Sequence, residues 1–492
     1  MPAKLVVIGD SLSQGFISGS ICKTDFSYPQ MLADCLGIQD FRVPDFGGEG
    51  GLPLNLDQLF RLLARRYGAK VSWLEVPMAL LSVRSFMDRV EDYWERGEGS
   101  EASPTGPLHH NLAVWGFELG DCDTLTEAIC RRTIPRDKDD LLNQIPEFAM
   151  YRTARRTLNP QFLPQYEELS QIKAAEAIAR SQGGIDNLMF WLGGNNCLGT
   201  VGRLKIVWSQ LADINRLSHE RSATLWVPEH FRQLLRRVAD KISAIGAKNV
   251  FIGTIPHVTI PPVSRGISPG RTPDRERSAD GYYDYYTHFW VWDNDFAKAP
   301  DQYPALTQND ARQIDQVIDE YNEAIATEAQ KRGWHVVDFC RALDRLAYRR
   351  QNGRPVYVFP PELVQALKTN PGTQDRFTVD GKPILDTRYL RVKSDAPPGE
   401  RHQGGIFSLD GIHPTTVGYG IVAHEVLQVM KSVTPGQIVK PLDWNKIVAA
   451  DVLLNDLPAN LESLRDILGF LSSQGPLPNL IRSITGGFGV NQ

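Results

Sequence analysis

Short apolar runs alternate with amphipathic helical stretches along this chain, and this alternation constrains its fold more than any other feature. Two helical stripes end at glycines, Gly246 and Gly333, and an apolar run follows each of them within three residues. Helices commonly end at a glycine. The runs that read as strands are 5–8, 188–192, 249–253 and 334–339. Because strands that alternate with helices pair in parallel and are covered on both faces, we expect an α/β fold with a mainly parallel sheet.

Two polar residues come shortly after predicted strands. Ser11 follows the run 5–8, and Asn195 follows the run 188–192, in each case after at least one glycine. Ligands of parallel sheets bind beyond the carboxyl ends of the strands. Both side chains are therefore expected to reach the same edge of the sheet.

The segment Gly9-Asp10-Ser11-Leu12 offers a candidate nucleophile. A serine hydroxyl at the start of a helix has free backbone N–H groups nearby, and these can stabilise an oxyanion. Ser11 or Ser13 can also serve simply as a helix cap. The two interpretations are compatible, and four common residues in a row are a weak signal on their own.

A carboxylate and an imidazole lie three positions apart far downstream, in Asp410-Gly411-Ile412-His413-Pro414. A serine nucleophile needs a base, and the base needs a group that orients it, so His413 and Asp410 supply the missing chemical types. A surface turn or a metal-binding pair are the alternatives, although a metal site requires further ligands close by.

Two glycine-containing segments are candidate oxyanion sites. In the first, Gly193 and Gly194 allow a tight turn, after which the side-chain amide of Asn195 can donate a hydrogen bond. A turn asparagine that bonds its own backbone is the alternative. The second is the run 46–51, where four glycines let the backbone approach a ligand closely. A flexible turn is its alternative, and no Gly-Lys-Ser/Thr follows that would indicate a phosphate loop.

Taken in order, these segments resemble the sequence blocks of the SGNH hydrolases, also called the GDSL esterase/lipase family. Ser11 matches the serine of the first block, and Asn195 matches the asparagine of the third. Asp410 and His413 match the Asp-x-x-His of the last block. The third block usually reads Gly-x-Asn-Asp, and this chain has Asn196 in place of the aspartate.

The glycine block matches least well. Gly48, which precedes the acidic Glu49, is the first candidate, and Gly50 is the second. The blocks cover about half of the chain, and the long segments between them lie outside the resemblance.

The resemblance implies a three-layer α/β/α, flavodoxin-like fold with large helical insertions. It also implies hydrolysis of carboxylic esters through an acyl-enzyme on Ser11, with His413 as the base and Asp410 orienting it. The implied oxyanion hole combines the backbone N–H of Ser11, that of Gly48 or Gly50, and the side chain of Asn195. Family members need no metal and no organic cofactor.

The same pattern predicts how the chain is divided. The expected core segments are 1–75, 181–260, 311–349 and 406–432, the last of which carries the Asp/His block. The expected insertions are a helical one at 76–180 that could act as a lid, an aromatic-rich one at 261–310, and one rich in Pro, Gly and charge at 350–405. A carboxyl-terminal extension follows at 433–492.

Composition excludes several classes of partner. The net charge of −5 and the absence of long basic runs give no reason to expect nucleic acid. No apolar run approaches the ~20 residues of a membrane helix, and no leader is visible. The six cysteines show no Cys-x-x-Cys spacing, which favours free, mostly buried thiols in a cytoplasmic protein. We expect a small-molecule ester as the partner. Self-association through the apolar stripe at 461–471 is possible, but packing of this stripe onto the core of the same chain is the more frequent outcome.

Several features leave alternatives open. The aromatic segment 282–292 is expected either to wall the substrate pocket or to pack into its own insertion. His257 is expected in a loop, with a place in the site as the alternative, and the pair His109-His110 is expected at the surface. An acyltransferase using the same acyl-enzyme, or a catalytically silent SGNH-like binding module, are the alternative functions.

Overall fold

A computed structural model gives the fold of residues 1–72, 74–134, 148–270, 278, 280–347, 356–393, 395–397 and 399–461, and all structural statements refer to these residues. The predicted stripe at 461–471 lies almost entirely outside them. None of the helices in this part of the chain combines the length and the apolar character needed to cross a membrane.

A parallel sheet forms the centre of the molecule. Its four strands are β1 (Val6–Gly9), β5 (Asn187–Trp191), β6 (Asn249–Gly253) and β10 (His335–Val337), in the order β1-β5-β6-β10. These are the four predicted strands, with β10 shorter than expected because Asp338 already caps the next helix. All residues of β1 and β5 are buried. Since successive side chains of a strand point to opposite faces, both faces of the sheet are covered.

A fifth extended segment, residues 110–114, lies on the other side of β1. The Val7 amide donates to the His110 carbonyl at 2.9 Å, and the Leu112 amide donates to the Val7 carbonyl at 2.9 Å. The bridge between Val7 and Asn111 is parallel. When the five segments are numbered by their order along the chain, their order across the sheet is 2-1-3-4-5, which is the flavodoxin-like arrangement. The point where the strand order reverses lies between β1 and β5.

This segment overturns one expectation and qualifies another. His109 and His110 are buried, not exposed, because they enter the edge of the sheet. The predicted helical insertion 76–180 thus contains a segment of the central sheet, as well as helix α8 (Gln171–Gln182), which contacts β1. The division of the chain into core and insertions otherwise stays a prediction.

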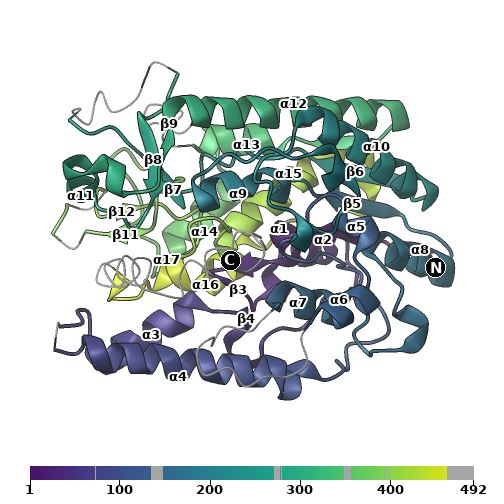
Figure 1. The fold of residues 1–492 in the computed structure, drawn as a ribbon, viewed down its shortest axis with the longest axis horizontal. Coiled ribbons are helices and arrows are strands. Elements are labelled where there is room, and N and C mark those ends of the chain that lie inside the picture. The colour runs from purple at the N-terminus through teal and green to yellow at the C-terminus, as the bar shows by residue number, and fades with distance from the viewer. Residues whose placement is uncertain are drawn as a thin grey trace.

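Long helices flank the sheet (Figure 1). Helices α10 (Pro228–Ala244) and α12 (Gln308–Arg332) pack against each other, as do α2 (Tyr28–Cys35) and α15 (Thr416–Val433). Helices α12 and α15 both contact β10. Figure 1 shows α12 along one edge of the molecule and α3 (Leu56–Tyr67) with α4 (Val76–Glu95) along the opposite edge. This is the three-layer α/β/α architecture that the sequence predicts.

Smaller elements complete the described chain. Three small antiparallel sheets are formed by β2 (Phe16–Ile17), β3 (Ser20–Ile21) and β4 (Leu52–Pro53); by β7 (Ser264–Ile267), β8 (Tyr285–His288) and β9 (Leu306–Thr307); and by β11 (Arg391–Val392) and β12 (His402–Gln403). The remaining α-helices are α1 (Ser11–Gln14), α5 (Asp121–Thr124), α6 (Glu127–Thr133), α7 (Ala149–Leu158), α9 (Asn195–Arg203), α11 (Asp293–Lys298), α13 (Phe339–Leu346), α14 (Pro361–Thr369), α16 (Trp444–Ala450) and α17 (Val452–Asn455).

Candidate active site

Ser11 is the first residue of the short helix α1, immediately beyond the carboxyl end of β1. Asp10 caps this helix, since its side chain accepts a hydrogen bond from the Leu12 amide at 3.1 Å. Asp10, and not Ser11 or Ser13, is therefore the cap, which leaves the Ser11 hydroxyl free of that structural task. Ser11 is largely buried and lines a cavity at the sheet edge.

Hydrogen bonds join the two ends of the chain beside this serine. The Ser18 amide donates to Ser408 Oγ at 2.9 Å, and the Gly19 amide donates to Asp410 Oδ2 at 2.9 Å. The Tyr419 hydroxyl, on α15, donates to the Phe16 carbonyl at 2.6 Å. The segment after Ser11 and the segment around Asp410 thus form one unit, although about 390 residues separate them.

Asp410 holds the ring of His413. Its Oδ2 lies 3.0 Å from His413 Nδ1, and both side chains are buried. The backbone amides of Ile412 and His413 donate to Asp410 Oδ1, each at 2.8 Å. Burial by itself raises the pKa of Asp410, but the charge of His413 and these hydrogen bonds outweigh it and place the pKa below its usual value. Asp410 is accordingly an ionised carboxylate at neutral pH.

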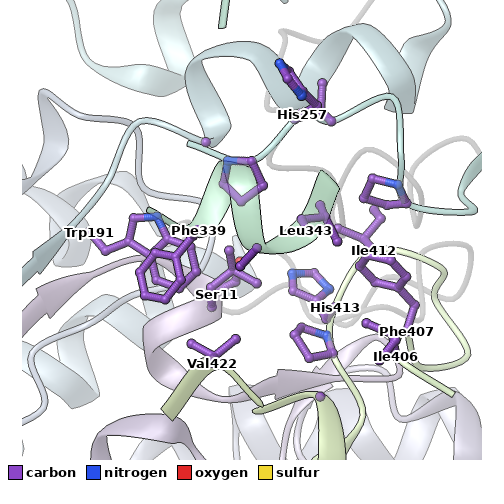
Figure 2. Close-up of a pocket in the computed structure, with 18 of the residues that line it drawn as sticks. Ser11, Trp191, His257, Phe339, Leu343, Ile406, Phe407, Ile412, His413 and Val422 are labelled. Carbon is purple, nitrogen blue, oxygen red and sulfur yellow. The ribbon is translucent and has the colours of Figure 1, made fainter. Parts of the chain in front are cut away.

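Ser11 and His413 face the same cavity (Figure 2). The Phe16 ring packs against the His413 ring, with 4.4 Å between the ring centroids. Among the contacts of the described residues, no hydrogen bond joins the Ser11 hydroxyl to this ring. Catalytic hydrogen bonds are often loose before substrate binds.

Asn195 is the first residue of α9, beyond the carboxyl end of β5, whereas Ser11 lies beyond the end of the neighbouring strand β1. Asn195 lines the same cavity. Its Nδ2 donates to the Phe117 carbonyl at 2.8 Å. Because an amide nitrogen carries two hydrogens, one of them stays available for a substrate oxygen. Asn196, which replaces the expected aspartate, points elsewhere and accepts a hydrogen bond from the Leu119 amide at 2.9 Å.

Gly48 and Gly50 are not brought to this cavity. They belong to a short 3₁₀ turn, Gly48–Gly50, that packs against α4. A Cβ atom at Gly48 would lie 2.1 Å from Tyr93 Oη, and one at Gly50 would lie 2.3 Å from Gln58 Oε1. Neither glycine is among the described residues that line the cavity. The glycine run therefore allows close packing against α4, and its place in an oxyanion hole stays a prediction.

Gly116 is also absent from the described residues that line the cavity, but it lies close to Ser11 along the sheet edge, and sequence reasoning did not single it out. It follows the edge segment 110–114, and the Val114 amide donates to the Gly9 carbonyl at 3.1 Å, directly beside Asp10 and Ser11. The next carbonyl along the chain, that of Phe117, accepts the Asn195 side chain. Within the described chain the Gly116 N–H has no hydrogen-bond partner, and its φ of 78° suits glycine. The apolar run Leu112-Ala113-Val114-Trp115 ending at a glycine was the available signal.

The cavity has a volume of about 120 Å³ and walls that are mostly apolar. Trp191 and Phe339 stack at one side, with 3.8 Å between their centroids, and Ile406, Phe407 and Ile412 lie at the other (Figure 2). None of the residues of the aromatic segment 282–292 lines it. That segment contains β8 and packs partly within 261–310, where the ring centroids of Tyr285 and Phe296 are 5.6 Å apart, and partly on 350–405, where Phe289 stacks on Tyr389 at 4.2 Å.

Asp10 is a second buried carboxyl in the cavity wall. Burial is the main influence and raises its pKa to about 7, although the hydrogen bond from Leu12 and the charge of His413 lower it. Near neutral pH Asp10 is thus only partly ionised, whereas Asp410 is ionised, and of the two only Asp410 hydrogen-bonds the imidazole.

His257 also lines the cavity, which confirms the alternative placed on it from the sequence. Its Nδ1 lies 2.9 Å from Asp344 and its Nε2 lies 3.1 Å from Asp319. Cys340 Sγ is 3.6 Å from Nδ1. One donor atom each from His257, Asp319 and Cys340 fall within 4.8 Å of one another, a set that could hold a metal ion. In the structure both ring nitrogens are occupied by carboxylates, which makes the group an ion-pair clamp. The six cysteines are all free, and five are buried.

A sequence model of a known family matches residues 120–426, which is more than half of the chain. It describes the GDSL-like lipase/acylhydrolases. The chain belongs to this family. The matched stretch contains Asn195, Asp410 and His413 and begins after Ser11, so Ser11 is placed by the fold and not by the match. No curated protein matches the chain in a sequence comparison. Membership in the GDSL-like family supports acylhydrolase-type activity for this protein.

Proposed function

We propose that this protein hydrolyses carboxylic esters with an apolar acyl group, through an acyl-enzyme on Ser11. One observation carries the proposal: a hydroxyl from the first strand end and a carboxylate-held imidazole from near the other end of the chain face a single apolar cavity. The cavity lies at the reversal point of a flavodoxin-like sheet, where such folds bind their ligands.

In the proposed reaction, His413 accepts the proton from the Ser11 hydroxyl as the oxygen attacks the ester carbonyl. The protonated imidazole is stabilised by Asp410 at Nδ1. His413 then gives the proton to the departing alcohol. Water, deprotonated by the same ring, attacks the acyl-enzyme and releases the carboxylic acid and free Ser11.

Three donors are proposed for the oxyanion: the backbone N–H of Ser11, the backbone N–H of Gly116, and the free hydrogen of Asn195 Nδ2. They come from the ends of three neighbouring segments of the sheet, β1, 110–114 and β5. Because these segments are fixed by the sheet, the donors need little reorganisation as charge develops on the oxygen.

The test is turnover of para-nitrophenyl esters by wild type, Ser11→Ala and Asn195→Ala. Ser11→Ala should remove nearly all turnover, and Asn195→Ala should lower kcat by about 10²–10³, as for other oxyanion donors. Near-normal turnover by Ser11→Ala would refute the proposal. Unchanged melting temperatures would show that neither change acts through unfolding.

The assignment of Gly116 over Gly48 has its own test. Gly116→Ala places a Cβ where φ is positive and disturbs the proposed donor, so kcat should fall. Gly48→Ala meets Tyr93 and should lower stability by about 1–3 kcal/mol with kcat of the folded enzyme unchanged. The reverse pattern would return the donor role to Gly48.

A further inference from the structure

We infer that the groove between α13 and α15 binds a medium-length acyl chain of about eight carbons, and that Glu425 marks its far end. This inference rests on the proposed ester hydrolysis at Ser11. It assigns a substrate class and a residue that sets specificity to that same cavity.

Two helical stripes form facing walls of the groove. The wall from α13 consists of Phe339, Ala342, Leu343 and Leu346. The wall from α15 consists of Gly418, Ile421, Val422 and Glu425. Both sets have the spacing i, i+3, i+4, i+7, which places them on one face of each helix. The two helices contact each other, and both stripes line the same cavity as Ser11 and His413.

Both stripes run away from the reacting groups. Helix α13 begins two residues after β10, and α15 begins three residues after His413, so both helices start at the carboxyl edge of the sheet. At this near end, Phe339 stacks on Trp191 and a Cβ at Gly418 would lie 2.9 Å from Pro414 Cβ. Leu346 and Glu425 therefore lie at the end remote from Ser11.

Glu425 is held in place by Tyr357. The Tyr357 hydroxyl donates to Glu425 Oε1 at 2.5 Å, and its backbone amide donates to the Arg345 carbonyl at 3.1 Å. Tyr357 thus ties the end of α13 to the middle of α15 and fixes the Glu425 carboxylate. An apolar chain that extended past this point would remove water from the partly exposed carboxylate, and hydrocarbon offers no hydrogen bond in its place, which is unfavourable. Glu425 consequently acts as a stop.

The helix geometry gives the length of the chain. Gly418 and Glu425 are seven residues apart, or about 10 Å along a helix, and an extended chain advances about 1.2 Å per bond, so about eight bonds fit. This length indicates an acyl group near octanoyl.

The experiment is a series of para-nitrophenyl esters from two to fourteen carbons, assayed with wild type, Val422→Phe, Ala342→Phe and Glu425→Ala. In wild type, kcat/KM should rise about threefold to fourfold per added methylene up to eight carbons and then fall. The two Phe variants should move the optimum to four carbons or fewer. Glu425→Ala should move it to ten or twelve. The matched control is Gln428→Phe, on the exposed side of α15, which should leave the optimum unchanged.

Val422 is only partly buried, so Val422→Phe keeps the test available where Ala342→Phe fails to fold. If kcat/KM of wild type did not depend on acyl length, or if neither Val422→Phe nor Glu425→Ala moved its optimum, the groove would not be the acyl site. The proposed ester hydrolysis would be unaffected by that result. Absence of Ser11-dependent turnover with every ester would overturn the proposed function and the groove with it.

Discussion

Two histidines face the same cavity, and their surroundings differ in one respect. His413 has a single carboxylate partner, Asp410, at Nδ1. His257 has a carboxylate at each nitrogen, Asp344 at Nδ1 and Asp319 at Nε2. Within the described residues, no hydrogen bond occupies Nε2 of His413. One partner orients a ring and leaves a nitrogen for substrate chemistry, whereas two partners lock the ring in place.

The two carboxylates also set the charge of His257. Burial by itself lowers the pKa of His257, but hydrogen bonds to Asp319, Asp344 and Cys340 outweigh it and raise the pKa to about 11. A ring that stays protonated at neutral pH cannot accept the serine proton. His257 instead fastens the loop after β6, which forms part of the cavity wall, to α12 and α13. The same residue type thus has a chemical role at one site and a positioning role at the other.

Exchanging each histidine for alanine should show the largest difference between the two sites. His413→Ala removes the proposed base, and kcat should fall about 10⁴–10⁶-fold, as for other triads. His257→Ala should change kcat less than tenfold, because the loop is also held by Asn322, which contacts the backbone of Ile255 on both sides. Steady-state kinetics with a soluble ester measure both. Equal losses in the two variants would contradict the division of roles.

Changing one carboxylate at each site gives the next largest effect. Asp410→Asn leaves a side chain that favours the wrong tautomer of His413, so kcat should fall by about 10³–10⁴. Asp344→Asn leaves Asp319 in contact with His257 and should alter kcat by less than a few fold. The melting temperature is the control, since Asp410 also accepts a hydrogen bond from the Gly19 amide. A loss of turnover that merely follows a loss of folded protein would count against the orienting role.

The pH dependence of the unfolding free energy should show the contribution of the charge on His257. The pKa of His257 is raised from about 6.5 in the unfolded chain to about 11 in the folded protein. Its contribution to stability is therefore complete below about pH 6.5 and declines as the pH rises toward 11. Wild type should lose more unfolding free energy than His257→Gln between pH 7 and 10, measured by urea titration. Parallel curves would show that the clamp contributes nothing through its charge.

The sequence predicted the regular part of this arrangement. The strands around 188–192 and 249–253 and the helices that end at Gly246 and Gly333 were found because period and end signals agree there. Ser11 and Asn195 were selected because each follows a strand, and Asp410 and His413 because a carboxylate and an imidazole three positions apart can serve as orienting group and base. The structure brings Ser11, Asn195 and His413 to the cavity wall, with Asp410 behind the His413 ring.

The proposed donor Gly116 and the edge segment were missed for related reasons. The segment 110–114 begins with polar residues and pairs with only one strand, so its composition is not that of a buried strand. The run 46–51 has the stronger glycine signal, but that signal does not distinguish close packing against α4 from close approach to a ligand. His257 could not be assigned because its partners Asp319 and Asp344 come from helices far along the chain.

Covalent labelling of the serine shows whether Ser11 is the nucleophile and whether His413 activates it. An alkyl fluorophosphonate that reacts with activated serines should attach to Ser11, as located by mass spectrometry of peptides, in wild type and in His257→Gln at similar rates. His413→Ala should show at least a hundredfold slower labelling. Attachment at another residue, or labelling that depends on His257 and not on His413, would contradict the account.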